Sequence, residues 1–171
     1  MSARQTRMQL LTFSIAGEPC AIEARLVTEV LPLVPARPLP QVPDYVLGMF
    51  TYRGDLVPLV DLSRRMAAGP PRQRLSTRVI VVEFRPPERL ADAAVRLGLV
   101  AENVIGIRGA DKAAVGSPPL QLASAPYLGP LLRLGGETVQ VIDIRRLLPD
   151  DLLAGLFPSV PSVVRPTEGR S

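Results

Sequence analysis

The sequence contains no histidine and a single cysteine, Cys20. Without histidine there is no Ser-His or Cys-His nucleophile pair, no HExxH zinc motif and no histidine phosphoacceptor. A lone cysteine excludes an intrachain disulfide and a cysteine-based metal site, and we interpret it as a small buried hydrophobic residue. We therefore expect a protein that is not an enzyme, with no catalytic residues, no metal and no cofactor.

Long hydrophobic runs are also missing. No stretch of about 18 uncharged apolar residues occurs, so no transmembrane helix or direct membrane insertion is expected. The N-terminal apolar run is interrupted by Thr12 and Ser14, which favours a strand over a signal peptide. We expect a cytoplasmic protein.

Aromatic residues make up only 4% of the chain. The net charge of +4 and the pI of about 10.0 would permit binding to an anionic surface. Sequence-tolerant binding to single-stranded nucleic acid, however, requires aromatic side chains among the cations, and the arginines are spread along the chain. We expect no nucleic-acid partner and keep an SH3-like-barrel nucleic-acid-binding protein as the alternative from a different class.

The residues that are abundant favour a mainly β fold. Of 171 residues, 47% are hydrophobic, enough to bury a core, and the 19 prolines and 13 glycines predict many turns and short elements. Three hairpins are predicted from strand-like runs around glycine turns. They lie at residues 8–15 and 19–23 around Gly17, at 45–62 around Arg53-Gly54-Asp55, and at 127–144 around Gly135-Gly136.

The remaining segments are less regular. Residues 77–84 are rich in β-branched residues and predict a strand, and residues 93–107 predict two strands or a strand and a turn. After the last hairpin we expect short helices, broken at Pro149 and restarted with Asp150 as the cap. Loops are predicted at 67–77 and 108–119, and a disordered tail at 158–171.

A weak internal repeat relates the second and third hairpins. Gly48 corresponds to Gly129 at an offset of 81 residues, and Gly54 to Gly136 at 82. Asp61 and Asp143 also lie 82 residues apart. About five short strands per half would suffice for a small barrel but not for an independent open sheet.

Several of these residues have structural explanations. Gly54 and Gly136 are predicted to form turns, and Asp61 and Asp143 to cap helix starts, where aspartate is favoured. Arg53 admits two interpretations. Its guanidinium could reach a carboxylate of a partner protein, or it could pair with a neighbouring carboxylate such as Glu29 or Asp55.

The order of motifs resembles the CheW-like family of chemotaxis coupling proteins. The matching segments are "LTFSIAGEPCAIEARLVTEVL", "VPDYVLGMFTYRGDLVPLVDL", "RVIVVEF", "LGLVAENVIGI" and "YLGPLLRLGGETVQVIDIRRLL". The most specific part is Gly-x5-Gly-x2-Val-Pro-Leu-Val-Asp-Leu with an arginine before the second glycine. The resemblance covers residues 8–157, which leaves 158–171 as a tail.

The resemblance implies two interleaved SH3-like five-stranded β-barrels, formed by partly intertwined repeat halves. It also implies a non-catalytic adaptor that links the cytoplasmic tips of chemoreceptors to the regulatory domain of a CheA-type histidine kinase, recruited to membrane-associated receptor arrays. By matching motifs, Val27 and Glu29 would lie on the kinase-binding surface. Arg53, Val104 and Ile107 would lie in the receptor-binding groove between the barrels.

The sequence departs from the family pattern at two places. Thr51-Tyr52 stands where the family often has Asn-Leu, and Ala101-Glu102-Asn103 stands where it often has Val-Asp-Gly. These differences leave open an adaptor of a non-flagellar pathway, for surface sensing or twitching, with a different receptor.

Overall fold

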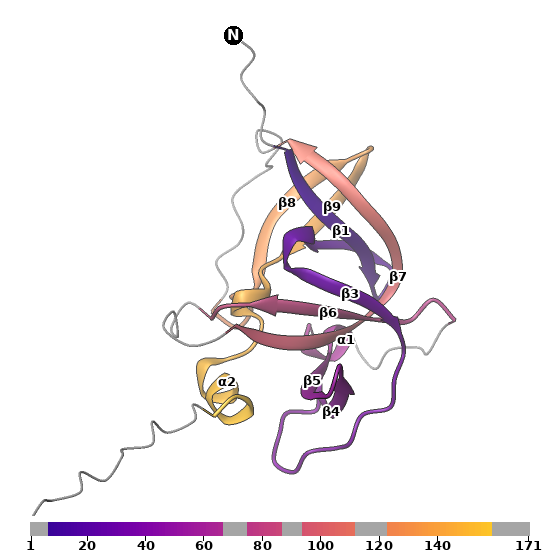
Figure 1. Cartoon of the computed structure of the whole chain (residues 1–171). Helices are drawn as coiled ribbons and strands as arrows, with labels where there is room; N and C mark the ends of the chain where they lie inside the picture. The colour runs from indigo at the N-terminus through magenta and orange to yellow at the C-terminus, as the bar shows by residue number, and fades with distance from the viewer. Residues whose placement is uncertain (1–6, 67–74, 87–93, 112–122, 159–171) are drawn as a thin grey trace, which may run out of the picture.

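The computed structural model describes residues 7–66, 75–86, 94–111 and 123–158 (Figure 1). The predicted tail at 158–171 lies outside these residues from position 159 onward, as do most of the two predicted loops. The elements in chain order are β1 (Arg7–Ile15), β2 (Glu18–Glu23), η1 (Ala24–Leu26), β3 (Val27–Pro32), β4 (Val46–Tyr52), β5 (Asp55–Asp61), α1 (Leu62–Arg65), β6 (Arg78–Phe84), β7 (Val95–Asp111), β8 (Leu128–Leu134), β9 (Glu137–Ile142), η4 (Ile144–Arg146) and α2 (Asp150–Leu156).

The described strands form two groups of five that share β7, in agreement with the mainly β fold expected from the sequence. In the first group the order is β3-β6-β7-β5-β4, and in the second it is β7-β1-β2-β9-β8. Each group contains three antiparallel pairings and one parallel pairing, in the same order. The first group closes on itself through a bridge between Arg37 and Met49, whose backbone N–H groups donate to each other's carbonyls at 2.8 and 2.9 Å.

The backbone repeats at the offset seen in the sequence. The Asp61 N–H donates to the Tyr45 carbonyl at 2.8 Å, and the Asp143 N–H donates to the Tyr127 carbonyl at the same distance. Corresponding residues of the two pairs are 82 positions apart, since 143 − 61 and 127 − 45 are both 82. Each contact joins the residue just before a hairpin to the residue at its end. The two halves of the chain therefore have the same local backbone arrangement.

Residues 93–107 differ from the prediction of two strands or a strand and a turn. The described part of this segment from Val95 onward belongs to one continuous strand, β7, which extends to Asp111 and so takes in part of the loop predicted at 108–119. The cause of the misreading is Asn103, which has a φ of +47° inside the strand. It bends β7 without ending it, and the pairing of β7 with β1 shifts register between Thr12 and Ser14, opposite this bend.

The predicted cap of the last helix was also wrong by one residue. Pro149 is the N-cap of α2, and Asp150 is the first helical residue. Asp150 and Asp151 then lie in the first turn, where their carboxylates interact favourably with the helix dipole.

The largest core cluster lies where the two groups meet. It combines side chains of the first group, such as Val60 of β5 and Ile80 of β6, with side chains of the second, such as Phe13 of β1 and Ile142 of β9. Cys20 belongs to this cluster, and burial raises the pKa of its thiol to about 11. The thiol is therefore neutral and packs as a hydrophobic residue. Because side chains of both groups build this one cluster, the two groups fold as one unit.

Gly48 and Gly54 offer a matched test of how closely β4 approaches the backbone of Arg37. Both have positive φ, +137° and +84°, but a Cβ at Gly48 would lie 2.0 Å from the Arg37 carbonyl oxygen, whereas at Gly54 it would meet nothing within 4 Å. We expect Gly54→Ala to lower the free energy of unfolding by about 1 kcal/mol, from backbone strain alone. Gly48→Ala should cost about 3 kcal/mol or more, because overpacking adds to the strain. Urea denaturation of both variants measures the difference, and equal losses would contradict the close approach.

Candidate functional site

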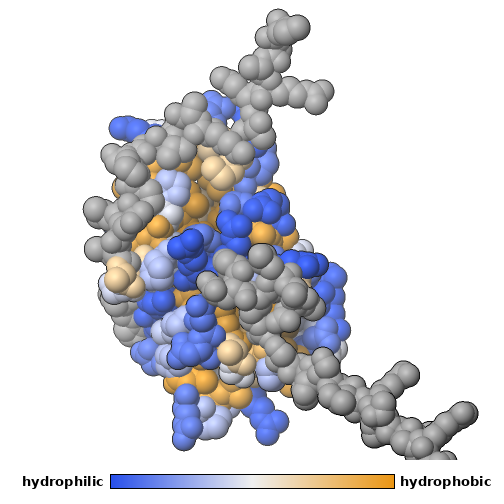
Figure 2. Space-filling model, turned by 90° about the vertical axis from the view of Figure 1, so that its left-hand side faces the viewer, coloured by the Kyte–Doolittle hydropathy of each residue, from blue (hydrophilic) through white to orange (hydrophobic). Residues whose placement is uncertain are grey.

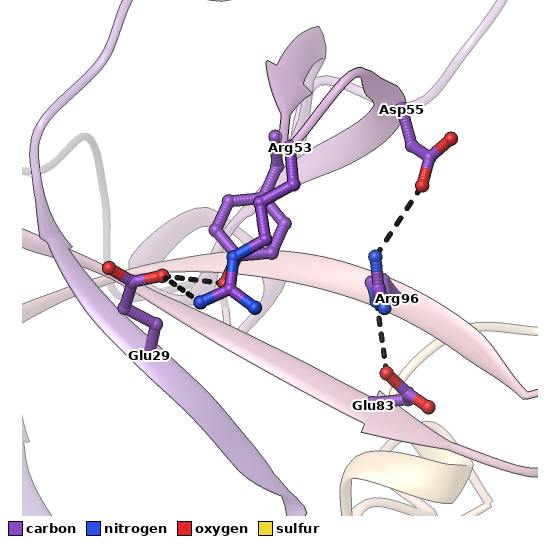
Figure 3. Close-up of polar contacts among 6 residues, drawn as sticks. Glu29, Arg53, Asp55, Glu83 and Arg96 are labelled. Carbon is purple, nitrogen blue, oxygen red and sulfur yellow. Dashed lines mark hydrogen bonds and ion pairs between the residues drawn. The ribbon is translucent and has the colours of Figure 1, made fainter.

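An exposed group of polar side chains surrounds the turn between β4 and β5 (Figure 3). We call it the hairpin network. Its members come from five strands of the first group: Glu29 of β3, Tyr52 of β4, Arg53 of the turn, Asp55 of β5, Glu83 of β6 and Arg96 of β7.

The turn itself has an unusual residue at its first position. Arg53 and Gly54 form a two-residue hairpin loop in which both residues have positive φ, +49° and +84°. This is the type I′ geometry, which strongly favours asparagine or glycine at the first position. An arginine there bears backbone strain, and its side chain points toward Glu29 (Figure 3).

Glu29 accepts two hydrogen bonds from the end of β4. Its Oε2 atom receives the Tyr52 hydroxyl at 2.6 Å and the Arg53 Nη2 group at 3.3 Å. The guanidinium of Arg53 also lies over the Tyr52 ring, 5.2 Å from its centroid, at a distance typical of a cation–π contact. Of the two interpretations of Arg53, pairing with Glu29 is therefore present, and 65% of the Arg53 side chain remains exposed for other contacts.

Asp55 does not pair with Arg53, although it is only two residues away. It contacts Arg96 instead, with 3.5 Å between Oδ2 and Nη1. Arg96 also donates from Nε to Glu83 at 2.9 Å, and the two residues are directly opposite in the β6–β7 pairing. Hydrogen bonding to Glu83 raises the pKa of Arg96 further, so this cation is permanent. Arg96 thus links the turn to the sheet below it.

The hydrogen bond to Glu29 raises the pKa of Tyr52 above its ordinary value, with burial as the second cause. A phenolate could not donate this bond and would be repelled by the carboxylate. Tyr45 also has a raised pKa, but there the main cause is burial.

The five residues assigned to partner surfaces fall into three places. Glu29 and Arg53 contact each other in the hairpin network. Val27 and Val104 are both half-buried and pack against the central core cluster. Ile107 lies opposite Leu11 of β1 and is 64% exposed. The contacts thus join Glu29 and Arg53, which the resemblance had placed on two different surfaces.

The residues expected at turns and caps occupy those positions. Gly136 has a φ of +85° in the β8–β9 turn, as Gly54 has in the equivalent turn. The Asp61 carboxylate accepts from the Arg64 N–H at 3.3 Å, and the Asp143 carboxylate accepts from the Arg145 N–H at 3.1 Å. Asp61 is fully buried, and burial raises its pKa.

Sequence reasoning missed Tyr52, Glu83 and Arg96 as members of the network. Tyr52 had been noted only as a departure from the family pattern, and Arg96 only as one of many scattered cations. The sequence offered one signal: Glu83 and Arg96 have opposite charges and lie on two strand-like segments. The two residues would be neighbours if those strands paired. The register that places them opposite each other is not marked by a local signal in the sequence, so the sequence did not reveal it.

Two features are absent from the described residues. No group of three or more His, Cys, Asp or Glu side chains there is arranged to hold a metal ion. Within the same part of the chain, no helix is both long enough and apolar enough to cross a membrane.

The two five-stranded groups that share β7 define a mainly β module with an exposed charged turn. A sequence model of the "CheW-like domain" matches residues 9–152, and the chain belongs to this family. It is 25% identical over 150 residues to the chemotaxis protein CheW of Treponema pallidum, covering 86% of this chain and 85% of that protein. It is 27% identical over 143 residues to protein FrzA of Myxococcus xanthus, with coverage of 82% and 84%.

The fold has a solved counterpart. The crystal structure of the scaffolding protein TtCheW from Thermoanaerobacter tengcongensis superposes with a TM-score of 0.71 at 22% sequence identity, covering 83% of this chain and 92% of that one. This likeness confirms the fold class expected from the sequence.

The contact between Tyr52 and Glu29 makes a pH-dependent prediction. Because the pKa of Tyr52 is raised in the folded state, the hydrogen bond contributes stability that is fully present below the ordinary tyrosine pKa of about 10 and is lost as pH rises through the folded pKa. Glu29→Gln should return the titration of Tyr52 toward its ordinary range. NMR of isotope-labelled tyrosine measures this directly. Tyr45, whose shift arises mainly from burial, serves as the internal control and should not move.

Proposed function

We propose that this chain is a non-catalytic adaptor that couples the cytoplasmic tips of chemoreceptors to a CheA-type histidine kinase. The observation that carries the proposal is the family match over residues 9–152, together with relatives that are named as chemotaxis proteins and are covered over most of their length. We further propose that the protein acts in the cytoplasm and is recruited to membrane-associated receptor arrays.

The surface supports a protein that binds other proteins. Leu56, next to the hairpin network, is 69% exposed, and a shallow hollow of about 310 Å³ beside it is lined by Asp55, Glu83 and Arg96 among others. On the outer face of β7, Ile105 and Ile107 are 74% and 64% exposed. Figure 2 shows hydrophobic surface exposed between hydrophilic patches on one face of the molecule. Exposed apolar side chains with charges at the rim suit a protein interface.

We assign Val27 and Glu29 to the kinase-binding surface, and Arg53, Val104 and Ile107 to the receptor-binding groove. The Glu29–Arg53 contact at 3.3 Å supports two surfaces that adjoin each other at this ion pair. A partner that engages the exposed Arg53 guanidinium would compete with Glu29 for it, so binding at one surface can alter the other.

Arg53→Glu tests the receptor assignment. We expect this variant to lose recruitment to receptor arrays, because it places a carboxylate where a cation is proposed to contact the receptor. Its unfolding free energy should change by only about 1 kcal/mol, as is usual for an exposed residue. Array recruitment is measured by co-sedimentation with receptor-containing membranes and kinase, and stability by urea denaturation.

The charge-swapped variant Glu29→Arg/Arg53→Glu is the matched control. If Arg53 contacts the receptor itself, the swap will not restore recruitment. Restoration by the swap would mean that Arg53 acts only by pairing with Glu29. A loss of stability well beyond that of an exposed residue would mean that Arg53 is structural.

The alternative of nucleic-acid binding is tested by salt. Most arginines of the described residues pair with carboxylates, including Arg7 with Asp111 and Arg108 with Glu137, and they are spread over several strands and do not form one continuous basic stripe. We expect affinity for the kinase regulatory domain to change by less than about tenfold between low and physiological salt. Phosphate-driven binding would fall about a thousandfold or more over that range. Calorimetric titration at two salt concentrations separates the two, and a steep dependence would favour nucleic acid.

A further inference from the structure

A second and larger hollow lies away from the hairpin network and shares no residue with it. Its volume is about 610 Å³, within the range of roughly 300–1,000 Å³ common for small-molecule sites. Both halves of the chain contribute to it. Tyr45 and Arg65 come from the first half, and Arg145, Arg146 and Asp150 from the second. We call it the arginine cavity.

Arg65 is held rigidly at one wall of the arginine cavity. Its guanidinium carbon lies 5.1 Å from the centroid of the Tyr45 ring and 4.5 Å from that of Tyr127, and its Nε donates to the Leu147 carbonyl at 2.7 Å. The two tyrosines occupy equivalent positions in the repeat. Within the described part of the chain, Arg65 has no ion pair with a carboxylate. Its charge is therefore fixed in place and not neutralised by a direct contact.

The other two arginines share one carboxylate. Arg145 Nε lies 3.4 Å from Asp143 Oδ1, and Arg146 Nε lies 3.7 Å from Asp143 Oδ2. Their side chains are 41% and 65% exposed, so both can move to meet a ligand. Among the described residues that line the cavity, Asp150 is the only carboxylate. The cations in this lining therefore outnumber the carboxylates by three to one.

Two other acidic residues lie nearby. Asp44 and Asp151 both act on the Tyr45 hydroxyl, but neither lines the cavity. Apolar surface is supplied mainly by the exposed Pro126 and Pro149, whereas Leu148 is almost fully buried behind the wall. The cavity thus combines guanidinium groups, which suit planar or tetrahedral oxyanions, with a small apolar wall.

We propose that the arginine cavity binds a small organic anion, through a phosphate or carboxylate group held by Arg65, Arg145 and Arg146, with the carbon portion against Pro126 and Pro149. Arg65 offers a preorganised charge, which lowers the entropic cost of binding. The site joins both halves of the fold, so a ligand there would contact both. The proposal does not depend on the adaptor function.

Three probes test the site and distinguish the sources of the anion: inorganic phosphate, phenyl phosphate and benzoate, each at ionic strength matched with sodium chloride. We expect saturable NMR shifts at residues 123–127 and 145–150 of the full chain. Tighter binding of phenyl phosphate than of inorganic phosphate would reflect the apolar wall. Its rank against benzoate tells whether phosphate or carboxylate is preferred.

Two variants of the cavity and one control variant make the test specific. Arg146→Ala should weaken binding about tenfold, as expected for the loss of one charge-assisted hydrogen bond. Asp150→Asn should strengthen binding, because it removes the opposing carboxylate from the cavity. Arg133→Ala removes an exposed arginine that does not line the cavity and should leave the affinity unchanged.

The proposal is overturned if no probe gives saturable shifts beyond those of sodium chloride. It is also overturned if the arginine and aspartate variants do not change affinity in opposite directions. Thermal denaturation without ligand verifies that each variant is folded, and the opposite signs expected for Arg146 and Asp150 cannot both arise from a general loss of stability.

Discussion

One uninterrupted strand holds this molecule together. β7 pairs with β6 and β5 over its first part and with β1 over its second, and the bend at Asn103 carries it from one group to the other. Leu97, Leu99 and Ala101 from this strand are all buried in the core cluster between the groups. Separating the two groups would expose that cluster and would break the pairing of β7 with strands of one group or the other. The surfaces on the two groups are therefore held in a fixed relation to each other.

The hairpin network depends on that rigidity. Glu29, Tyr52 and Arg96 stand on strands whose register is set by the ladder beneath them, and the turn is anchored between these side chains. Exposed ion pairs contribute only modestly to stability, typically about 0–1 kcal/mol each. The network therefore matters more for how it presents the turn than for how firmly the protein folds. This suits a surface that exchanges internal contacts for contacts with a partner.

Much of the fold was predictable from the sequence, because hairpins carry local signals. The turns at Gly17, Gly54 and Gly136 and the cap at Asp61 were placed correctly from glycine and aspartate positions. The continuity of β7 was not predictable, since the polar segment around Asn103 has the composition of a turn. The segment stays extended because β7 pairs with β6 before the bend and with β1 after it. In the site, the position of Arg53 followed from its hairpin. Its partner was one of two open choices, because the contact with Glu29 joins strands that are distant in the sequence.

The positive φ of Arg53 has a consequence for engineering. At the first position of such a turn, asparagine or glycine would relieve backbone strain that arginine must bear. A selection for thermal tolerance alone would therefore tend to replace the most exposed cation of the network. Variant libraries of this protein therefore need a second selection, for complex formation, if the stabilised variants are to keep Arg53.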